Sequence, residues 1–291
     1  MPISLNNKIS NLNLGSYLAG LYEGDGHISI STNDSHHKYI PRFNITFNLK
    51  DKPLADRLLY LIKKYSRIES GFIRIKNNEN ACVITISNRD SLIFIVNLMN
   101  GKLRGPKIHT FHKLIDWLNS NTKPELNIPK LGLNSNPLSN DGWLAGLIDA
   151  DGLFYIRNTP LTTKSKRRIA CRFTLEQRKV DPASKDTYEN LFMLIAKFLQ
   201  TKLNVRNQSI SNRQYYIISV SGLKSISVLL GYLSIHPLFS SKYLDYKAWG
   251  IAANYILNRE QYDNEEIIES LKGEMNNKRT KFNWDHLDNL N

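Results

Sequence analysis

Two aspartates occupy the same place in two copies of one nonapeptide. Asp25 is the eighth residue of the first copy, Leu18–Gly26, and Asp151 is the eighth residue of the second copy, Leu144–Gly152. We expect each copy to end a short helix, and the negative pole at a helix C-terminus disfavours a carboxylate. The two acids therefore need a compensating charge. Either they share a proton or they bind a divalent cation through oxygen, the ligand atom that Mg²⁺ prefers; in a plainer alternative they are polar caps.

Small residues give each expected helix one face that is almost bare. Gly20 and Gly24 are spaced i, i+4, and so are Gly146 and Ala150. Small residues at this spacing let two helix backbones approach closely, and the simplest partner for one such helix is the other. Docking of the two helices would place the two aspartates side by side. Metal-binding acids in a basic protein indicate phosphodiester chemistry.

The similarity between the two halves extends beyond the nonapeptides. Ile45–Lys50 matches Phe173–Arg178, and after a change of offset a second register runs from Ser87 onward and aligns Lys107 with Lys242. A chance match would not preserve order and register over so much of the chain. The sequence is therefore a tandem duplication.

Each half is expected to follow the order αββαββα. The first helix begins near Asn13 or Ser139, both good N-cap residues, and ends at the motif glycine, which suits a C′ position. Period-two alternation predicts half-buried antiparallel strands at 27–31, 42–48, 72–76 and 82–86, and again at 154–157, 168–175, 204–208 and 215–220. Further helices are expected at 52–65, 90–99, 186–199 and 225–233.

The fold class is thus α+β, with tandem units related by pseudo-two-fold symmetry and two saddle-shaped antiparallel sheets packed through the motif helices. The expected divisions are an N-terminal half at 1–118, a linker at 119–138, a C-terminal half at 139–258 and an appendage at 259–291. The linker is rich in Asn and Pro, and the appendage carries an apolar anchor at Phe282 and Trp284.

The second nonapeptide, LAGLIDADG, is identical to the signature that names the LAGLIDADG homing endonucleases, and the first is a close variant that differs at Tyr22, Glu23 and Gly24. Two copies in one chain resemble the monomeric, two-motif branch that group I introns encode, over nearly all of residues 13–255. The resemblance implies a monomer that binds double-stranded DNA at a long asymmetric site. It also implies a Mg²⁺-dependent double-strand break across the minor groove with 3′ overhangs, with Mn²⁺ as a substitute and Ca²⁺ supporting binding without cleavage.

The resemblance assigns roles to residues of the motif itself. The eighth position is the metal-binding acid of the family, which maps to Asp25 and Asp151. The carbonyl of the seventh position also ligates metal, which maps to Gly24 and Ala150. The sixth-position acids are structural in the family and receive no chemical role here: Glu23 and Asp149.

Further roles follow from the same resemblance outside the motif. A basic residue just before the last helix of each half lies near the scissile phosphate, which maps to Arg89 and Lys224. A Gln followed by a basic residue orders the hydrolytic water at the end of the second strand, which maps to Gln177–Arg178. The first half departs from this pattern with Asn48 and Lys50, which puts equal cutting by the two half-sites in doubt. The alternative for each position is a solvated surface charge.

Outward-facing strand residues are polar and often basic, a pattern typical of DNA-reading surfaces, because Arg, Asn and Gln contact base edges. A solvated sheet face without a ligand is the alternative. In the first half the expected DNA-binding residues are His27, Ser29, Ser31, Arg42, Asn44, Thr46, Asn48, Arg74 and Lys76. In the second half they are Tyr155, Arg157, Arg168, Arg172, Thr174, Glu176, Asn204, Arg206 and Gln208, with phosphate contacts from Lys164, Lys166 and Arg167.

Composition agrees with a nucleic-acid partner. The 291 residues include 39 Lys and Arg against 26 Asp and Glu, a net charge of +13, which suits a polyanion. Cys82 and Cys171 lie in apolar runs and are expected to be buried free thiols, which excludes a disulfide framework. No segment reaches bilayer-spanning length, so no membrane partner is expected. The protein is expected to be intracellular, and the resemblance, with residue usage typical of AT-rich genes, predicts a mitochondrial location.

Two other functions stay open. Some relatives of this family bind intron RNA as maturases, with or without nuclease activity. Loss of a motif acid is their usual mark, and the presence of both acids here favours the endonuclease. A plain two-fold DNA-binding regulator would need no acids at its helix ends and explains less.

Overall fold

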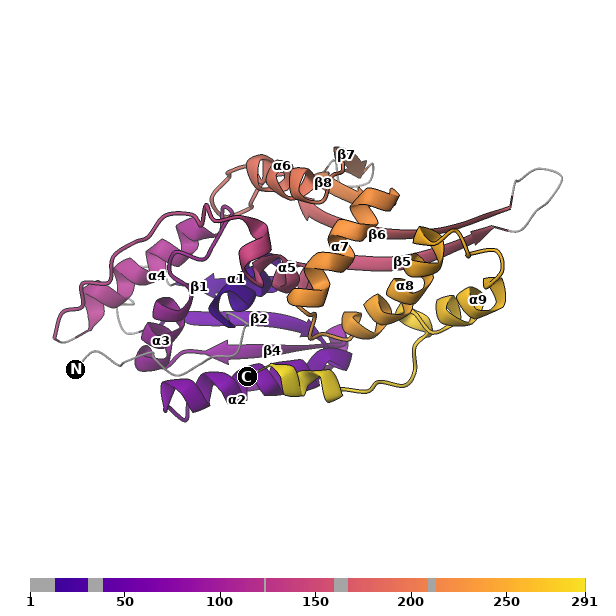
Figure 1. Cartoon of the computed structure of the whole chain (residues 1–291). Helices are drawn as coiled ribbons and strands as arrows, with labels where there is room; N and C mark the ends of the chain where they lie inside the picture. Colours follow the sequence, from indigo (N-terminus) through magenta and orange to yellow (C-terminus); the bar gives the residue numbers. More distant parts are fainter. Residues whose placement is uncertain (1–13, 31–38, 123, 160–166, 209–212, 291) are drawn as a thin grey trace.

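Each half of the chain forms a four-stranded antiparallel sheet with helices packed on one face. The computed structural model describes residues 14–30, 39–122, 124–159, 167–208 and 213–290. The strand orders are β1-β2-β4-β3 and β5-β6-β8-β7, the same order in both halves. Figure 1 shows the two sheets on either side of a central pair of helices, α1 and α5.

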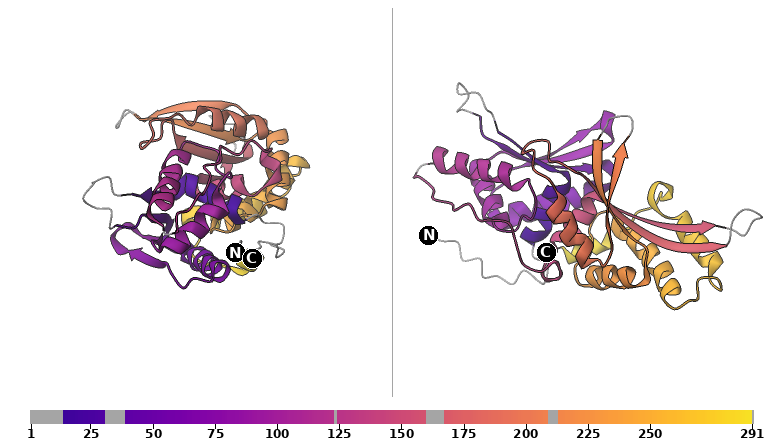
Figure 2. Two further views of the ribbon diagram at one scale, coloured as in Figure 1. Left: turned by 90° about the vertical axis from the view of Figure 1, so that its left-hand side faces the viewer. Right: turned by 90° about the horizontal axis from the view of Figure 1, so that it is seen from above.

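The N-terminal half contains α1 (Leu14–Asp25), β1 (Gly26–Ser29), β2 (Arg42–Asn48), α2 (Lys52–Ser66), β3 (Phe72–Lys76), β4 (Ala81–Ile86), α3 (Arg89–Met99) and α4 (Ile108–Asn121). The C-terminal half contains α5 (Trp143–Asp151), β5 (Gly152–Thr159), β6 (Arg168–Arg178), α6 (Glu189–Phe198), β7 (Leu203–Gln208), β8 (Arg213–Val220), α7 (Leu223–Ile235) and α8 (Lys242–Leu257), and α9 (Glu265–Gly273) follows. The α+β class, the duplication and the pairing through the motif helices are confirmed. The β5–β6 hairpin extends far from the central helices (Figure 2).

Each half has one helix more than the predicted αββαββα order. The additional helices are α4 and α8, which begin where the loop after α3 or α7 ends. In α4 the apolar residues Ile108, Phe111 and Leu114 recur at helical spacing and are buried. The expected linker therefore starts three residues too early, at 119, because α4 continues to Asn121.

The ends of the motif helices differ from the expected caps. A 3₁₀ turn occupies Leu138–Asn140, and α5 begins only at Trp143, whose N–H donates to Asp141 Oδ1 at 3.0 Å. Ser139 is therefore not the N-cap, and Asn13 lies outside the described residues. Gly152 is in extended conformation at φ −74° rather than left-handed. It must be small because an added Cβ would lie 2.7 Å from the Ile148 carbonyl oxygen.

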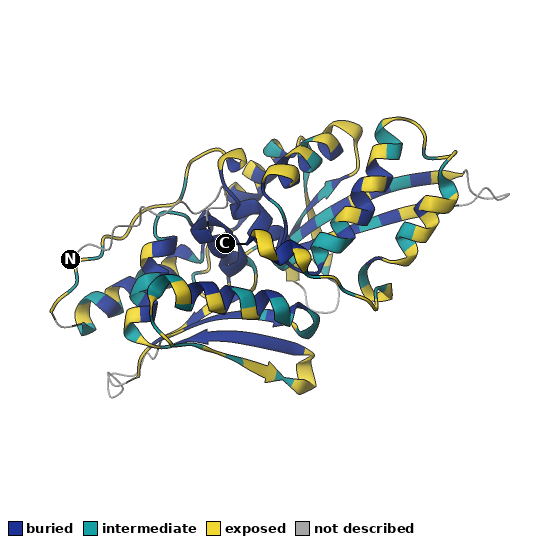
Figure 3. Ribbon diagram, turned by 60° about the horizontal axis from the view of Figure 1, so that its bottom comes forward, coloured by how far each residue is buried: buried dark blue, intermediate teal, exposed yellow. Residues whose placement is uncertain are grey.

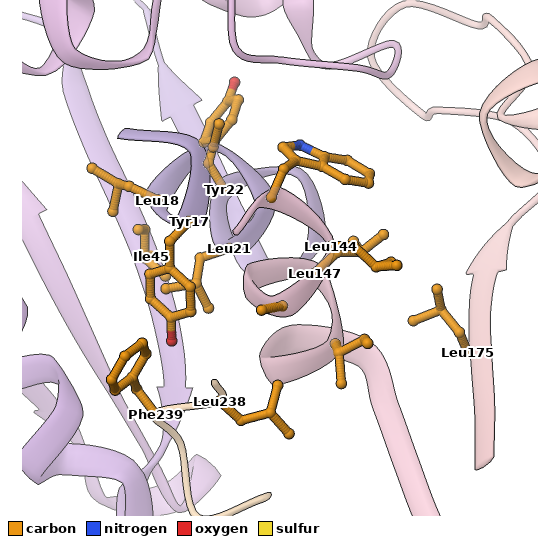
Figure 4. Close-up of a cluster of buried hydrophobic side chains, with 14 of the residues drawn as sticks. Tyr17, Leu18, Leu21, Tyr22, Ile45, Leu144, Leu147, Leu175, Leu238 and Phe239 are labelled. Atoms are coloured by element: carbon orange, nitrogen blue, oxygen red, sulfur yellow. The ribbon is translucent and has the colours of Figure 1, made fainter. Parts of the chain in front are cut away.

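The two motif helices pack backbone to backbone, as the small residues predict. A Cβ added at Gly20 would lie 1.9 Å from the Trp143 carbonyl oxygen, and one added at Gly146 would lie 2.1 Å from the Tyr17 carbonyl oxygen. Leucine and aromatic side chains from both helices surround this contact (Figure 4). The centre of the molecule is consequently buried, whereas the outer helices expose one face (Figure 3).

The C-terminal segment after α9 contacts both halves. Leu287 and Leu290 are buried, and the Leu290 carbonyl accepts a hydrogen bond from Arg57 Nε of α2 at 2.9 Å. His286 Nε2 lies 3.1 Å from the Phe239 carbonyl oxygen in the C-terminal half, and Trp284 stacks on the His286 ring. This segment therefore bridges α2 and the loop before α8.

Cys82 and Cys171 are free and buried, as predicted. Within the described ranges, none of the helices has the length and apolar character needed to cross a bilayer.

Candidate active site

Asp25 and Asp151 are the last residues of α1 and α5, and the close packing of these helices places them side by side. A Cβ added at Gly24 would lie 2.2 Å from the Ala150 Cβ and 3.0 Å from Asp151 Oδ2. The two carboxylates thus meet at one centre between the halves, as the sequence predicts.

The environment of these acids disfavours two negative charges. Burial, and after it the neighbouring Asp25, raise the pKa of Asp151 to about 7 against the opposing pull of Lys242 and Lys107. The pKa of Asp25 is also raised, chiefly by the protein that displaces water around it. Because Asp25 is exposed at the surface of the site, solvent weakens this effect, and Asp151 is the more strongly perturbed group. An additional cation or proton would stabilise the pair.

Two half-buried lysines donate hydrogen bonds to the carbonyl groups at the C-terminal ends of the motif helices. Lys107 Nζ donates to the carbonyl oxygens of Gly24 and Gly26, both at 2.7 Å. Lys242 Nζ donates to the Ala150 carbonyl oxygen at 2.5 Å. An ammonium at a helix C-terminus offsets the negative helix pole and lone carbonyl groups. Burial lowers the pKa of both lysines, while the neighbouring carboxylates oppose that shift.

These lysines are the site residues that sequence reasoning missed. Their register between the two halves was visible, and each lies at the start of an additional helix: Lys107 immediately before α4 and Lys242 as the first residue of α8. A paired basic residue at that boundary was the signal available.

Arg89 and Lys224, which the resemblance places near the scissile phosphate, do not pack against the two carboxylates, and their role at the phosphate stays a prediction. Gly26, which follows Asp25, pairs with Ile45 of β2, so this part of β2 lies nearest the site. Ile86, the last residue of β4, pairs with Phe43 of β2, which lies further from the site. The chain therefore reaches Arg89 beyond the distal end of the strands, where its guanidinium lies over the Trp117 ring at 5.6 Å.

Lys224 has the equivalent position in the other half. Gly152, which follows Asp151, pairs with Leu175 of β6. Val220, the last residue of β8, pairs with Phe173, further from the site, and the chain then continues to Lys224. Lys224 is exposed in the first turn of α7.

Glu23 is buried and binds main-chain groups, in agreement with a structural role. It accepts hydrogen bonds from the N–H groups of Arg104 at 2.9 Å and Gly105 at 2.5 Å, and from Trp143 Nε1 of the opposite half at 2.6 Å. Burial raises its pKa to about 7, although these hydrogen bonds lower it.

Asp149 makes the matching contacts in the other half. It accepts hydrogen bonds from the Phe239 N–H at 2.7 Å, from Ser240 Oγ at 2.6 Å and from Tyr17 Oη of the opposite half at 2.6 Å. Each sixth-position acid therefore holds the loop that carries its own lysine and one aromatic residue of the other motif helix.

The two half-sites differ at the end of the second strand. Gln177 Nε2 donates to Asp151 Oδ2 at 3.3 Å. Asn48 instead accepts a hydrogen bond from the Lys50 N–H at 3.1 Å and so caps the turn after its own strand. Arg178 is exposed and Lys50 half-buried. Only the Asp151 side has an amide contact with its carboxylate among the described residues.

A cavity of about 290 Å³ lies between the halves beside this centre. Its lining residues include Tyr22, His27, Lys107, Gln177, Arg178 and Asp181. The loop between β6 and α6 supplies one wall, whereas the matching connection between β2 and α2 is a short turn. The surroundings of the two carboxylates are therefore unequal in shape.

Comparison with known proteins identifies the family of this chain. The sequence model of the LAGLIDADG endonuclease family matches residues 18–118 and 144–253. The chain belongs to the LAGLIDADG endonuclease family. It is accordingly an endonuclease, and each matched segment contains one motif aspartate and one of the two half-buried lysines.

Individual relatives agree with the family assignment. The chain is 29% identical to the intron-encoded DNA endonuclease aI3 of Saccharomyces cerevisiae, over 98% of this chain and 74% of the relative. It is 29% identical over half its length to the intron-encoded RNA maturase bI4 of the same species, of which 20% is covered. The solved structure of the I-LtrWI LAGLIDADG homing endonuclease bound to target DNA has the same fold, with a TM-score of 0.64 and 20% identity over 92% of this chain and 99% of that one.

In this LAGLIDADG endonuclease, the outward face of the N-terminal sheet carries most of the predicted polar residues. His27 lies opposite Asn44, and Ser29 lies opposite Arg42. Asn44 is buried rather than solvated, because its Oδ1 accepts a hydrogen bond from Thr85 Oγ1 at 2.9 Å. The remaining predicted residues on this face are Thr46, Asn48, Arg74 and Lys76, and Ser31 lies outside the described residues.

The outward face of the C-terminal sheet is basic. Arg172 donates to Ser219 Oγ at 2.9 Å and to Tyr155 Oη at 3.2 Å, and Glu176 pairs with Arg206. The other predicted residues on this sheet are Arg157, Arg168, Thr174, Asn204 and Gln208. Lys164 and Lys166 lie outside the described residues, and Arg167 pairs with Glu265. Tyr215 and Arg213, which were not predicted, share this face.

Proposed function

We propose that this LAGLIDADG endonuclease binds double-stranded DNA across its two outward sheet faces and hydrolyses one phosphodiester in each strand at the Asp25–Asp151 centre. The observation that carries the proposal is the meeting of these two carboxylates at the helix ends, between two polar sheet faces. A structural pair of caps would gain nothing from raised pKa values and mutual repulsion.

The residues at this centre fit a divalent cation. Carboxylate oxygens of Asp25 and Asp151, with the carbonyl oxygens of Gly24 and Ala150, are the hard ligands that Mg²⁺ prefers, and Mg²⁺ usually keeps waters and substrate phosphates for its other positions. Among the described residues, no group of three or more His, Cys, Asp or Glu side chains forms an all-protein cage. When bound, Mg²⁺ supplies charge stabilisation to the attacking and leaving oxygens.

The surrounding side chains support this chemistry from fixed positions. Lys107 and Lys242 provide two positive charges close to where phosphate charge develops, while their hydrogen bonds hold the helix ends. Gln177 orients the Asp151 carboxylate through its amide. Arg178 and Lys50 lie at the adjoining strand ends, where they would contact the DNA backbone.

Charge and symmetry support a long, asymmetric DNA site. The net charge of +13 favours binding to a polyanion, and the two sheets carry different outward residues. We propose that one chain covers the whole site as a monomer, because it contains both half-sites. Several relatives are intron-encoded by name, and we propose the mitochondrion as the compartment.

Selection from a randomised duplex library tests the proposal. Duplexes cut by the protein in Mg²⁺ are sequenced, and duplexes retained in Ca²⁺ are sequenced in parallel. We expect one long, asymmetric consensus in both sets, with double-strand breaks and 3′ overhangs in Mg²⁺ only, and similar cutting in Mn²⁺. Recovery of no consensus, or cutting that persists in EDTA, would contradict the proposal.

Intron RNA is a second candidate ligand, favoured by the similarity to the maturase described above. Both motif aspartates are present, so any splicing role would coexist with DNA cleavage. Splicing of the host intron RNA with and without the protein, alongside DNA cleavage, separates the two. Splicing that does not respond to the protein would exclude the maturase role.

A further inference from the structure

We infer that Asp51 of the N-terminal half is a positioning residue for Lys242 of the C-terminal half. The inference rests on the proposed DNA cleavage, and it adds a residue outside both motifs to the construction of one half-site. It predicts that the two DNA strands depend unequally on a single side chain.

Asp51 lies at the start of α2 but does not cap that helix. Aspartate at this position commonly accepts hydrogen bonds from the first N–H groups of its own helix, and Asp51 makes no such bond. Its Oδ1 instead accepts a hydrogen bond from the N–H of Ser241, in the opposite half, at 2.6 Å. Asp51 and Ser241 are 7% and 1% exposed. A buried hydrogen bond to a carboxylate is among the stronger ones.

The bond fixes the chain immediately before Lys242. Asp149 already binds the Phe239 N–H and Ser240 Oγ, so three consecutive residues are held by carboxylates before α8 begins at Lys242. With the chain held there, Lys242 Nζ reaches the Ala150 carbonyl oxygen, next to Asp151. Asp51 therefore acts on the site through the main chain of the other half.

The matching lysine cannot be held in this way. In the register that aligns Lys107 with Lys242, Pro106 corresponds to Ser241, and proline has no N–H to donate. Glu23 binds the two preceding N–H groups, those of Arg104 and Gly105. Carboxylates therefore bind two residues of the loop before Lys107 and three residues of the loop before Lys242. Asp51 supplies the third contact, which only the Lys242 loop has.

The test measures each strand separately, on the duplex returned by library selection with a different fluorophore on each strand. Asp51→Ala is expected to slow one strand by about tenfold or more, since small displacements of a site group are costly, and to accumulate nicked duplex. Asp51→Asn keeps the acceptor oxygen and should restore that strand to within about threefold. Asp56→Ala, which removes an exposed ion pair with Lys52 from the same helix, is the control and should leave both strands unchanged.

Ser241→Pro removes the donor and copies the other half. The Ser241 φ of −55° suits proline, so this variant keeps the test available if Asp51→Ala does not fold. It should slow the same strand, and the double variant should be no slower than the slower single variant, because both remove one bond.

Equal slowing of both strands by Asp51→Ala and Ser241→Pro, or no slowing by either, would overturn the inference while leaving the proposed function intact. A wild-type protein that cuts no duplex would overturn the proposed function itself.

Discussion

Gly146 lies directly against the backbone of Tyr17, so that an added Cβ would lie 2.1 Å from the Tyr17 carbonyl oxygen. The obstacle is main chain in a helix that packs on both sides, and it cannot rotate away. The whole geometry of the site depends on this contact, because it brings the two helix ends together.

Gly146→Ala is therefore expected to lower the free energy of unfolding by about 3 kcal/mol or more, as overpacking against a rigid neighbour does. Thermal or urea unfolding measures the change. Gly231→Ala is the matched control: Gly231 is in helix α7, and no atom lies within 4 Å of its added Cβ. It should raise stability by about 0.5–1 kcal/mol, and a similar loss in both variants would contradict the packing argument.

Asp25→Asn and Asp151→Asn should each abolish double-strand cleavage while DNA binding survives. Each substitution removes a metal-binding charge, and the loss of a negative charge does not weaken attraction to DNA. Cleavage and gel-shift assays on the selected duplex measure the two properties. Neither variant should be less stable than the wild type above pH 7, because like-charge repulsion is relieved. Wild-type cutting by both would remove the metal assignment.

Without metal, stability should fall as pH rises from about 4 to 7. Asp151 has a pKa of about 7 in the folded protein against an ordinary value of 3.8, so the folded state holds the proton after the unfolded state has lost it. The folded state binds more protons in this window, and the free energy of unfolding decreases with pH. Chemical denaturation across the window measures the slope. Asp151→Asn should reduce the slope without abolishing it, because the pKa of buried Glu23 is also raised to about 7, and an unchanged slope would argue against the raised pKa of Asp151.

The same proton competes with the cation. Since a ligating carboxylate must be ionised, apparent Mg²⁺ affinity should weaken by about tenfold for each pH unit below 7. Titration of Mg²⁺ at several pH values, with binding followed by calorimetry, measures this dependence. A flat profile between pH 5 and 7 would show that Asp151 does not ligate the metal.

Gln177→Ala should slow one DNA strand by about tenfold, because the variant loses the amide that orients Asp151. Asn48→Ala, at the corresponding place in the other half, loses a local cap and one polar group of the predicted DNA-binding face, but no contact with a carboxylate. With protein saturating the duplex, it should change cleavage of either strand by less than about threefold. Strand-specific rates measure the difference. Matching effects of the two substitutions would indicate that the half-sites are equivalent after all.

Local patterns in the sequence predicted most of the fold. Alternation located β2 and β3 at their observed bounds, and the bare faces of Gly20 and Gly146 predicted the docking that the structure shows. The extra helices α4 and α8 were not predicted, although the buried spacing in α4 is regular. Ser139 is a residue type that favours the N-cap, but the chain first makes a 3₁₀ turn there. The N-cap is Gly142, and Asp141 accepts a hydrogen bond from the Trp143 N–H.

The candidate site was only partly predictable, because its geometry depends on strand register. Asp25 and Asp151 follow from the motif and the packing of bare helices. Whether Arg89 or Lys107 lies beside these aspartates depends on which end of β4 is near the motif helices. The pairing of Ile86 with Phe43 places the end of β4 that leads to Arg89 away from them. Asn44 shows the same limit: its outward parity was right, and its burial follows from a hydrogen bond to a strand that is distant in sequence.

The segment from Trp284 to Leu290 binds the loop before α8 and also α2. Although this segment follows the C-terminal half in the sequence, it contacts both halves of the protein. Chimeras that exchange halves between relatives at the linker would therefore pair this segment with a foreign surface. Designers of hybrid enzymes with new target sites should transfer α2 and the final segment as one unit.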